Sequence, residues 1–261
     1  MAKREIRGSR AIVTGASSGI GREIALELAR QGAVQVLTAR REERLRELAE
    51  KIAAQRGRAE CVGGDITDSE TRRKAVEMAV SQFGGLDILV NNAGIGAVGL
   101  FEKADPERVR RIMEVNFFAL VEMTRLALPA LKQGAHPIVV NIGSVLGHRG
   151  VPYRSEYSAS KFAVQGFSES IRAEFGPLGI GVLVVSAGAT KTEFSEAVIE
   201  HTGEPSWPDY APVSPAAVAR QIVWAIRRGR HEIVPHRRGR VLLWANRLFP
   251  RLVDRLLARY V

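Results

Sequence analysis

Short runs rich in β-branched residues alternate strictly with helical segments along most of this chain. Strands are predicted at 10–14, 34–39, 59–63, 86–90, 138–142 and 181–186. Apolar residues recur at helical spacing between them, which predicts helices at 20–29, 41–55, 68–83, 106–133 and 156–175. This alternation is typical of parallel strands joined by helical crossovers. We therefore expect an α/β fold, a doubly wound parallel sheet in one domain over residues 1–235.

Composition narrows the class of protein. Of 261 residues, 46% are hydrophobic and 25% are charged, which suits a chain with a filled core rather than a disordered or fibrous one. The single Cys61 excludes an intrachain disulfide framework and favours a reducing compartment. The first residues lack an apolar signal segment, and no run of apolar residues is long enough to span a membrane. We expect a cytoplasmic protein.

One segment breaks the alternation. Residues 190–215 contain Pro205, Pro208, Pro212 and Pro215 together with glycine and aromatic residues. A loop of this length inside a compact domain is usually a lid or a binding loop. We therefore predict a substrate lid there, followed by a helix at 216–228 and a short strand at 232–234.

The positive charge is concentrated at the end of the chain. The formal net charge is +10, and residues 220–261 hold 11 Arg, no Lys and two acids. After Pro250, apolar residues fall on one side of a predicted helix and mostly basic residues on the opposite side. Residues 236–261 are therefore expected to form a basic amphipathic tail. The apolar stripe consists of Leu252, Val253, Leu256, Leu257 and Tyr260.

Three alternatives remain open for this tail. It could pack on its own subunit or on a second copy of the chain. It could also lie on an anionic membrane surface, with Trp244 and Phe249 as interfacial anchors. Nucleic-acid binding is disfavoured, because no reader motif accompanies the arginines. We expect no nucleic-acid partner and a possible peripheral location at a membrane.

A glycine-rich turn, Thr14-Gly-Ala-Ser-Ser-Gly-Ile-Gly21, joins the first strand to the first helix. Glycines there would let backbone N–H groups approach a pyrophosphate, and the helix N-terminus would favour its negative charge. The G-x-x-x-G-x-G spacing differs from the G-x-G-x-x-G fingerprint, and a plain turn is the alternative. The residues expected to bind a dinucleotide are Gly15, Ser17, Ser18, Gly19, Ile20 and Gly21.

The second predicted strand ends in Ala39-Arg40-Arg41. An acid near this position would bind the ribose 2′-hydroxyl of NAD. Two guanidiniums instead favour the 2′-phosphate of NADP through charge-assisted contacts, with Arg40 the better candidate. The alternative is that both arginines start a solvated helix and pair with Glu43 or Glu47.

Four polar residues are candidates for an acid–base catalytic site. Tyr157 and Lys161 are four apart on one helical face, Ser144 follows the fifth strand, and Asn116 lies in the long helix. A phenol ordinarily titrates near ~10, and a neighbouring ammonium lowers its pKa towards the range of a general acid or base. Ser144 lies at the sheet edge where ligands bind, so its hydroxyl could bond a substrate oxygen.

Taken together, these motifs resemble the short-chain dehydrogenase/reductase family over roughly residues 8–235. Residues 14–21 match its TGxxxGxG motif and residues 91–94 its NNAG motif, and the four polar residues match its catalytic tetrad. The resemblance implies an extended Rossmann fold, NADP(H), and hydride transfer between nicotinamide and a carbonyl or secondary alcohol. Further cofactor contacts that it implies are Asp65, Ile66, Asn92, Ala93, Gly94, Tyr157, Lys161, Gly188 and Thr192.

The resemblance also implies individual roles. Tyr157 would exchange a proton with the substrate oxygen, and Lys161 would lower the phenol pKa and bind the nicotinamide ribose. Ser144 would orient the substrate oxygen, and Asn116 would hold a water in a proton relay. Ala187 stands where the family usually has Pro, so cofactor placement there could loosen. Relatives are commonly dimers or tetramers built through the two longest helices, and no metal ligand is implied.

The substrate is less well determined. The expected pocket segments supply Ile95, Val98, Val145, Leu146, Val151, Tyr153, Phe194 and Trp207. This set suggests a hydrophobic alcohol or ketone, unless half of it faces the core. His148, Arg149 and Arg154 could meet an anionic group or lie in solvent. The alternative function is a dinucleotide-sensing binding or scaffold protein with vestigial catalysis.

Overall fold

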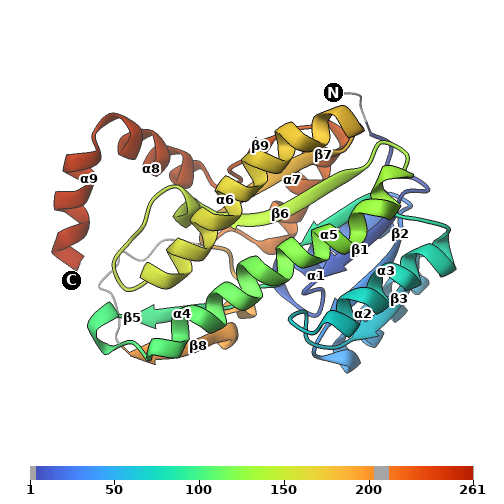
Figure 1. The fold of residues 1–261 in the computed structure, drawn as a ribbon, viewed down its shortest axis with the longest axis horizontal. Coiled ribbons are helices and arrows are strands. Elements are labelled where there is room, and N and C mark those ends of the chain that lie inside the picture. The colour runs from blue at the N-terminus through green and yellow to red at the C-terminus, as the bar shows by residue number, and fades with distance from the viewer. Residues whose placement is uncertain (1–3, 203–211, 261) are drawn as a thin grey trace.

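A central parallel sheet organises the computed structural model, which describes residues 4–202 and 212–260 (Figure 1). Within that part of the chain the strand order is β3-β2-β1-β4-β6-β7-β9, all parallel, which confirms the predicted doubly wound α/β fold. The strands are β1 (Arg10–Thr14), β2 (Val34–Ala39), β3 (Arg58–Gly63), β4 (Ile88–Asn91), β6 (Ile138–Ser144), β7 (Gly181–Ala187) and β9 (Glu232–Ile233).

Helices cover both faces of this sheet. Helices α1 (Gly19–Arg30), α2 (Glu42–Ala54) and α7 (Pro215–Arg227) pack on one face. Helices α3 (Ser69–Phe83), α5 (Ala119–Lys132) and α6 (Ser155–Phe175) pack on the other. Because side chains alternate along a strand, Ala11 and Val13 of β1 enter the first apolar layer while Ile12 enters the second. All three side chains are fully buried, so β1 lies at the centre of the fold.

The predicted single helix at 106–133 is wrong in one respect. It divides into α4 (Pro106–Met113), a π-helical turn (Glu114–Phe118) and α5. A π turn is rare and frequently lies at a functional site, and this one contains the buried Asn116. Apolar spacing does not reveal the wider turn, because its flanking segments are ordinary helices.

A second, smaller parallel sheet corrects the expectation of a continuous loop at 190–215. Strand β5 (Gly96–Gly99) pairs with β8 (Val198–Thr202), and a 3-10 helix (Glu193–Ala197) precedes β8. The sequence gives little sign of this sheet, because β5 reads Gly-Ala-Val-Gly and its partner lies about a hundred residues away. Pro205, Trp207 and Pro208 fall outside the described residues.

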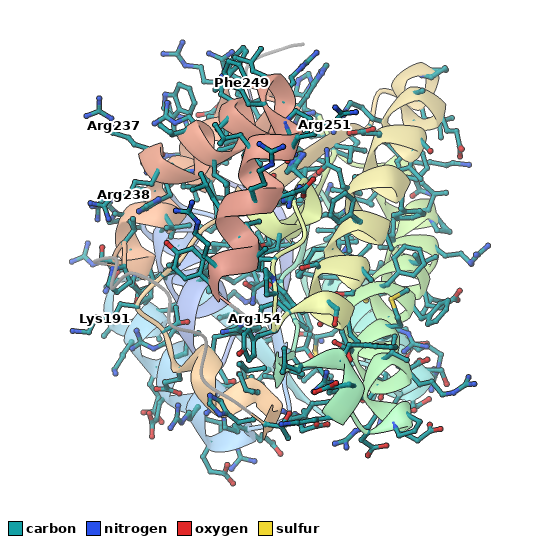
Figure 2. All side chains as sticks on the ribbon, turned by 90° about the vertical axis from the view of Figure 1, so that its left-hand side faces the viewer. Arg154, Lys191, Arg237, Arg238, Phe249 and Arg251 are labelled. Atoms are coloured by element: carbon teal, nitrogen blue, oxygen red, sulfur yellow. The ribbon has the colours of Figure 1, made fainter. Side chains whose placement is uncertain are left out.

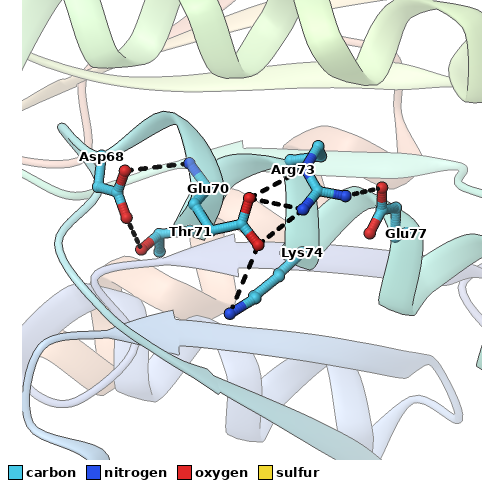
Figure 3. A network of polar contacts seen from close by, with 6 residues as sticks. All are labelled: Asp68, Glu70, Thr71, Arg73, Lys74 and Glu77. Atoms are coloured by element: carbon cyan, nitrogen blue, oxygen red, sulfur yellow. Dashed lines mark hydrogen bonds and ion pairs between the residues drawn. The ribbon is translucent and has the colours of Figure 1, made fainter.

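Exposed ion pairs link residues on the solvent side of α3 (Figure 3). Asp68 accepts the backbone N–H of Glu70 and so caps the helix. Arg73 pairs with Glu70 and Glu77, one helical turn away in each direction. Exposed pairs of this kind add little to folding stability, because water and salt screen both charges. The position of α3 therefore depends mainly on its buried apolar face.

The C-terminal segment forms two helices, α8 (Arg237–Leu248) and α9 (Pro250–Leu257), which project from one side of the molecule (Figure 1). Arg149 holds them to the body by donating to Asn246 and Asp254. None of the helices in residues 4–202 and 212–260 is long and apolar enough to cross a membrane. The division of the chain at residue 235 stays a prediction.

Candidate active site

A cleft of about 710 Å³ opens at the carboxyl ends of the central strands. It brings together nearly all of the predicted site residues, although they come from segments spread over most of the chain. Gly21 and Asn116 are the predicted residues that do not line it. The others are Gly15, Ser17, Ser18, Gly19, Ile20, Arg40, Arg41, Asp65, Ile66, Asn92, Ala93, Gly94, Ser144, Tyr157, Lys161, Gly188 and Thr192.

The glycine-rich turn needs its glycines for two reasons. Gly15 and Gly19 have φ angles of +64° and +56°, where a side chain is disfavoured. A Cβ on Gly15 would also lie 2.8 Å from the Asn92 side-chain nitrogen. Gly21 is buried behind the turn, and a Cβ there would overlap both Asn92 and the Gly15 carbonyl. Gly21 therefore permits close packing of α1 against the turn, and its predicted contact with a dinucleotide stays a prediction.

Asn92 fixes this turn against the neighbouring strand. Its side-chain amide donates to the carbonyls of Thr14 (3.0 Å) and Gly15 (3.1 Å), and its own N–H donates to the Thr14 hydroxyl (2.9 Å). The NNAG segment and the glycine-rich turn thus form one rigid unit. The N-cap residue of α1, Ser18, makes no side-chain cap bond, so the helix N-terminus is open towards the cleft.

The residues of this end fit a dinucleotide. A close backbone approach at Gly15, an open helix N-terminus and two adjacent guanidiniums suit a pyrophosphate and a further phosphate. Arg41 donates to the hydroxyls of Ser17 and Ser18 and pairs with Glu193, whereas Arg40 is exposed. Asp65 accepts from the N–H and hydroxyl of Thr67, which shapes the opposite wall.

Ser144, Tyr157 and Lys161 meet at the other end of the cleft. Ser144 ends β6, and the other two lie in the first turns of α6. The Lys161 ammonium donates to the Ile142 carbonyl (2.9 Å) and lies 5.6 Å from the centre of the Tyr157 ring. Burial raises the Tyr157 pKa, while a hydrogen bond with Ser144 and the charge of Arg154 act against that rise. The phenol therefore keeps its proton at neutral pH.

Lys161 makes the folding stability depend on pH. Burial lowers its pKa from the usual 10.5 to about 8. Between these values the unfolded chain still holds a proton that the folded chain has released, so the free energy of unfolding rises with pH. We expect Lys161→Met to abolish this rise, as measured by denaturant unfolding at a series of pH values. Wild-type and variant curves that stay parallel between pH 8 and 10.5 would contradict the assignment, because groups away from Lys161 contribute equally to both curves.

Asn116 acts on the backbone next to the cleft. Its side-chain oxygen accepts from the Ile95 N–H (2.8 Å), and its amide donates to the Ile95 carbonyl and the Ser160 hydroxyl (both 3.0 Å). These bonds hold the chain where it leaves β4 against the start of α6. The predicted water relay through Asn116 stays a prediction.

Part of the predicted substrate pocket lies elsewhere. Ile95, Val98 and Phe194 line the cleft, and Phe194 meets the Tyr157 ring edge-on at 5.8 Å. Four predicted residues do not line it: Val145, Leu146, Val151 and Tyr153. Trp207 lies outside the described residues. The prediction missed Val115, Ala197, Val198 and His201, three of which reach the cleft through β8 and the short helix before it.

The three basic residues considered for this region separate in the structure. Arg154 lines the cleft. Arg149 bonds to the C-terminal helices, and the His148 ring lies 2.9 Å from the Ser186 hydroxyl and from a Glu232 oxygen. Arg154 is therefore the one of the three that could meet a ligand in the cleft.

Comparison with known proteins agrees with the geometry. Residues 9–203 match the family model described as short chain dehydrogenase. The chain is 40% identical over 203 residues to 11-beta-hydroxysteroid dehydrogenase A of Sesamum indicum, an alignment that covers 77% of this chain and 58% of the sesame protein. The chain thus spans less than two thirds of that relative's length.

Two solved structures share the fold. A short chain dehydrogenase/reductase from Burkholderia phymatum in complex with NAD superposes with a TM-score of 0.87 at 22% identity, over 95% of this chain and 96% of that one. A short chain dehydrogenase from Burkholderia cenocepacia in complex with NADP gives 0.78 at 29% identity, over 88% and 97%. Neighbours of both coenzyme types therefore share this architecture.

Proposed function

This chain belongs to the short-chain dehydrogenase/reductase family of nicotinamide-dependent oxidoreductases, and from that premise we propose that it interconverts a carbonyl and a secondary alcohol on a hydrophobic substrate with NADP(H). One observation carries the proposal. Ser144, Tyr157 and Lys161 lie in the same cleft as the glycine-rich turn, so a dinucleotide held at one end would reach the polar group at the other.

The side chains divide the work of carbonyl reduction. A bound nicotinamide dinucleotide would supply the hydride. Because burial keeps the Tyr157 phenol protonated, it is ready to give a proton to the carbonyl oxygen. The Ser144 hydroxyl lines the same cleft as the phenol and would orient the same oxygen. Lys161 is fixed by the Ile142 carbonyl beside the Tyr157 ring, where its charge would favour the phenolate left behind.

The test is turnover. NADPH consumption should be measured with a panel of hydrophobic ketones, and the reverse reaction with the matching alcohols. Substrate-dependent turnover would support an oxidoreductase. Tight coenzyme binding without turnover of any substrate in either direction would instead favour the alternative, a dinucleotide sensor. An apolar substrate is supported by the cleft wall near Tyr157, which includes Ile95, Val98, Val115, Phe194, Ala197 and Val198.

Coenzyme preference gives a separate prediction. Arg40 is exposed at the cleft edge, where its guanidinium can meet a 2′-phosphate. We expect Arg40→Asp to shift the ratio of kcat/KM for NADPH over NADH by about tenfold or more towards NADH, since a phosphate contact becomes a repulsion. Arg46→Asp is the matched control, because Arg46 lies on α2 and pairs with Glu42 away from the cleft. An unchanged ratio in Arg40→Asp would refute the assignment.

The proposal also includes binding of the C-terminal helices α8 and α9 to an anionic membrane surface. Val253 and Leu257 are buried, so part of the apolar stripe packs within the chain. Trp244 (62% exposed) and Phe249 (60%) face outward, as do four further apolar side chains. Figure 2 looks onto this side, with Arg237, Arg238, Phe249 and Arg251 on the surface. Exposed apolar and cationic groups on one amphipathic segment suit an anionic lipid surface. The four further exposed apolar side chains of these helices are Val241, Leu248, Leu252 and Leu256.

Liposome sedimentation tests this location. We expect salt-sensitive binding to phosphatidylserine vesicles and little binding to neutral ones, at about 1 kcal/mol per basic residue near the surface. Exchanging four exposed tail arginines for Glu should reduce binding at least about tenfold. The variant exchanges Arg247, Arg251, Arg255 and Arg259, and its control exchanges the exposed Arg7, Arg46, Arg56 and Arg73 elsewhere on the surface. Equal binding by a chain truncated before Gly239 would refute membrane binding through the tail.

A homodimer or homotetramer is also part of the proposal. Three large apolar side chains are exposed on the π turn, α5 and α6: Phe118 (48%), Leu126 (39%) and Phe162 (46%). Exposed aromatic and aliphatic groups of this kind are enriched where subunits meet. They support association through the two long helical segments.

A further inference from the structure

Arg154 stands out at the reacting end of the cleft. Its side chain is half-buried and lines the cleft three residues before Tyr157. Its charge acts on the Tyr157 phenol, so the two groups are close neighbours. In Figure 2 Arg154 lies within the outline of the molecule, whereas Arg237 and Arg238 extend from its edge. Arg154 thus belongs to the cleft lining, which does not include Arg237 or Arg238 of the C-terminal helix α8.

A strained turn places Arg154 there. The preceding Tyr153 has a φ angle of +62°, in the left-handed region that non-glycine residues rarely adopt. The Tyr153 carbonyl accepts the N–H of Gly99 at the end of β5 (3.0 Å), which ties the turn to the small sheet. Such strain persists where the surrounding structure enforces it, and it concentrates at functional sites.

Among the side chains that the structure describes, which leave out 195 and 196, no carboxylate forms an ion pair with this cation. Burial and the Tyr157 phenol are the influences on the Arg154 pKa, and no acid is among them. The two acids that line the cleft have other partners: Asp65 accepts from Thr67, and Glu193 pairs with Arg41 and Arg44. A half-buried guanidinium without an acid carries an uncompensated desolvation cost, which a bound anion would relieve.

The neighbouring walls of the cleft are apolar. Ile95, Val98 and Phe194 line the cleft beside the phenol, and Phe194 touches the Tyr157 ring. A ligand that satisfies both kinds of surface has an apolar body and an acidic oxygen group close to its reacting carbon. A purely apolar ketone would leave the guanidinium unpaired, and an amine-bearing ketone would be repelled.

We propose that Arg154 is a specificity-determining residue that binds an acidic oxygen group, a carboxylate or a phosphate, on an otherwise hydrophobic carbonyl substrate. This rests on the proposed function and narrows its substrate class to acidic amphiphiles. The planar fork of Arg suits bidentate contact with either acid.

The experiment uses non-reacting probes, so that it does not require turnover. Decanoate, decyl phosphate and methyl decanoate share one chain and differ in the charge of the head group. Their affinities for the full chain should be measured by isothermal titration calorimetry, without and with NADP. We expect at least one acid to bind about tenfold or more tightly than the ester, as one charge-assisted pair requires. The acid that binds more tightly identifies the head group.

Three variants separate recognition from general damage. Arg154→Gln should lose the preference for acid over ester while it still binds the ester, and Arg154→Lys should keep part of the preference. Arg149→Gln is the matched control, because Arg149 lies outside the cleft and bonds to the tail; it should keep the full preference. Equal affinity of wild type for acids and ester, or equal losses for all probes in Arg154→Gln, would overturn the proposal.

A kinetic comparison then links the site to the reaction. A keto acid and its methyl ester should differ in KM in the wild type and converge in Arg154→Gln. If the probes bind as expected but no ketone turns over, the proposed function fails while the acid site stands. If ketones turn over without preference for acids, the function stands and the acid site fails.

Discussion

Replacing Tyr157 with Phe is expected to lower kcat for carbonyl reduction by about 10²–10⁴, the usual worth of a positioned general acid. The change removes one oxygen and leaves the ring, so the edge contact with Phe194 persists. Coenzyme affinity and the melting temperature should change little. The measurement is NADPH consumption at saturating substrate, together with coenzyme titration and thermal unfolding.

Tyr153→Phe is the matched control for this variant. Tyr153 lies four residues earlier and does not line the cleft, and its contact with Gly99 uses the backbone carbonyl. It should therefore keep most of the activity. If Tyr157→Phe retained more than about a tenth of wild-type kcat, another group would have to supply the proton.

The second large effect concerns stability, at a buried ion pair that supports the cleft wall. Arg108 of α4 is 1% exposed and donates to Glu156 of α6 (2.6 Å) and Glu200 of β8 (2.9 Å). Arg108→Met would leave two carboxylates without a counter-charge, one of them in Glu156, the residue before Tyr157. Breaking a buried pair in this way costs about 3–5 kcal/mol. We expect a loss of that size in the free energy of unfolding, measured by denaturant titration.

A second variant tests the cause of this loss. Arg110→Met removes an exposed arginine from the same helix, whose pair with Glu107 spans 3.6 Å, and should cost at most about 1 kcal/mol. Adding Glu156→Gln and Glu200→Gln to Arg108→Met should recover much of the stability, because no buried charge then lacks a partner. If the triple variant were no more stable than Arg108→Met, lost packing rather than unpaired charge would be responsible.

Local sequence patterns were sufficient to predict the central sheet and the helices that cover it. Each central strand is a short apolar run, and each covering helix has an apolar face, so period and order along the chain predict the sheet and its layers. The glycine-rich turn and the Tyr157–Lys161 spacing are equally local, because backbone freedom and the helical repeat act over a few residues. The order of the elements then predicts that these features share one cleft, because parallel strands carry their carboxyl ends to one edge of the sheet.

Residues that depend on distant partners could not be placed in this way. The pairing of β5 with β8 joins segments about a hundred residues apart, and it brings Val198 and His201 to the cleft while Val145 and Leu146 lie away from it. The π turn around Asn116 and the buried position of Arg108 likewise depend on contacts between separate elements.

For Arg154 the sequence left two alternatives, an anion contact or solvent. The tertiary structure places Arg154 in the wall of the cleft, where the two lining acids, Asp65 and Glu193, have other partners. The difference between features that the sequence predicts and features that only the fold places has one physical reason. Backbone propensity and side-chain periodicity are set by neighbours in the chain, whereas the burial and charge balance of a side chain are set by whatever the fold brings against it.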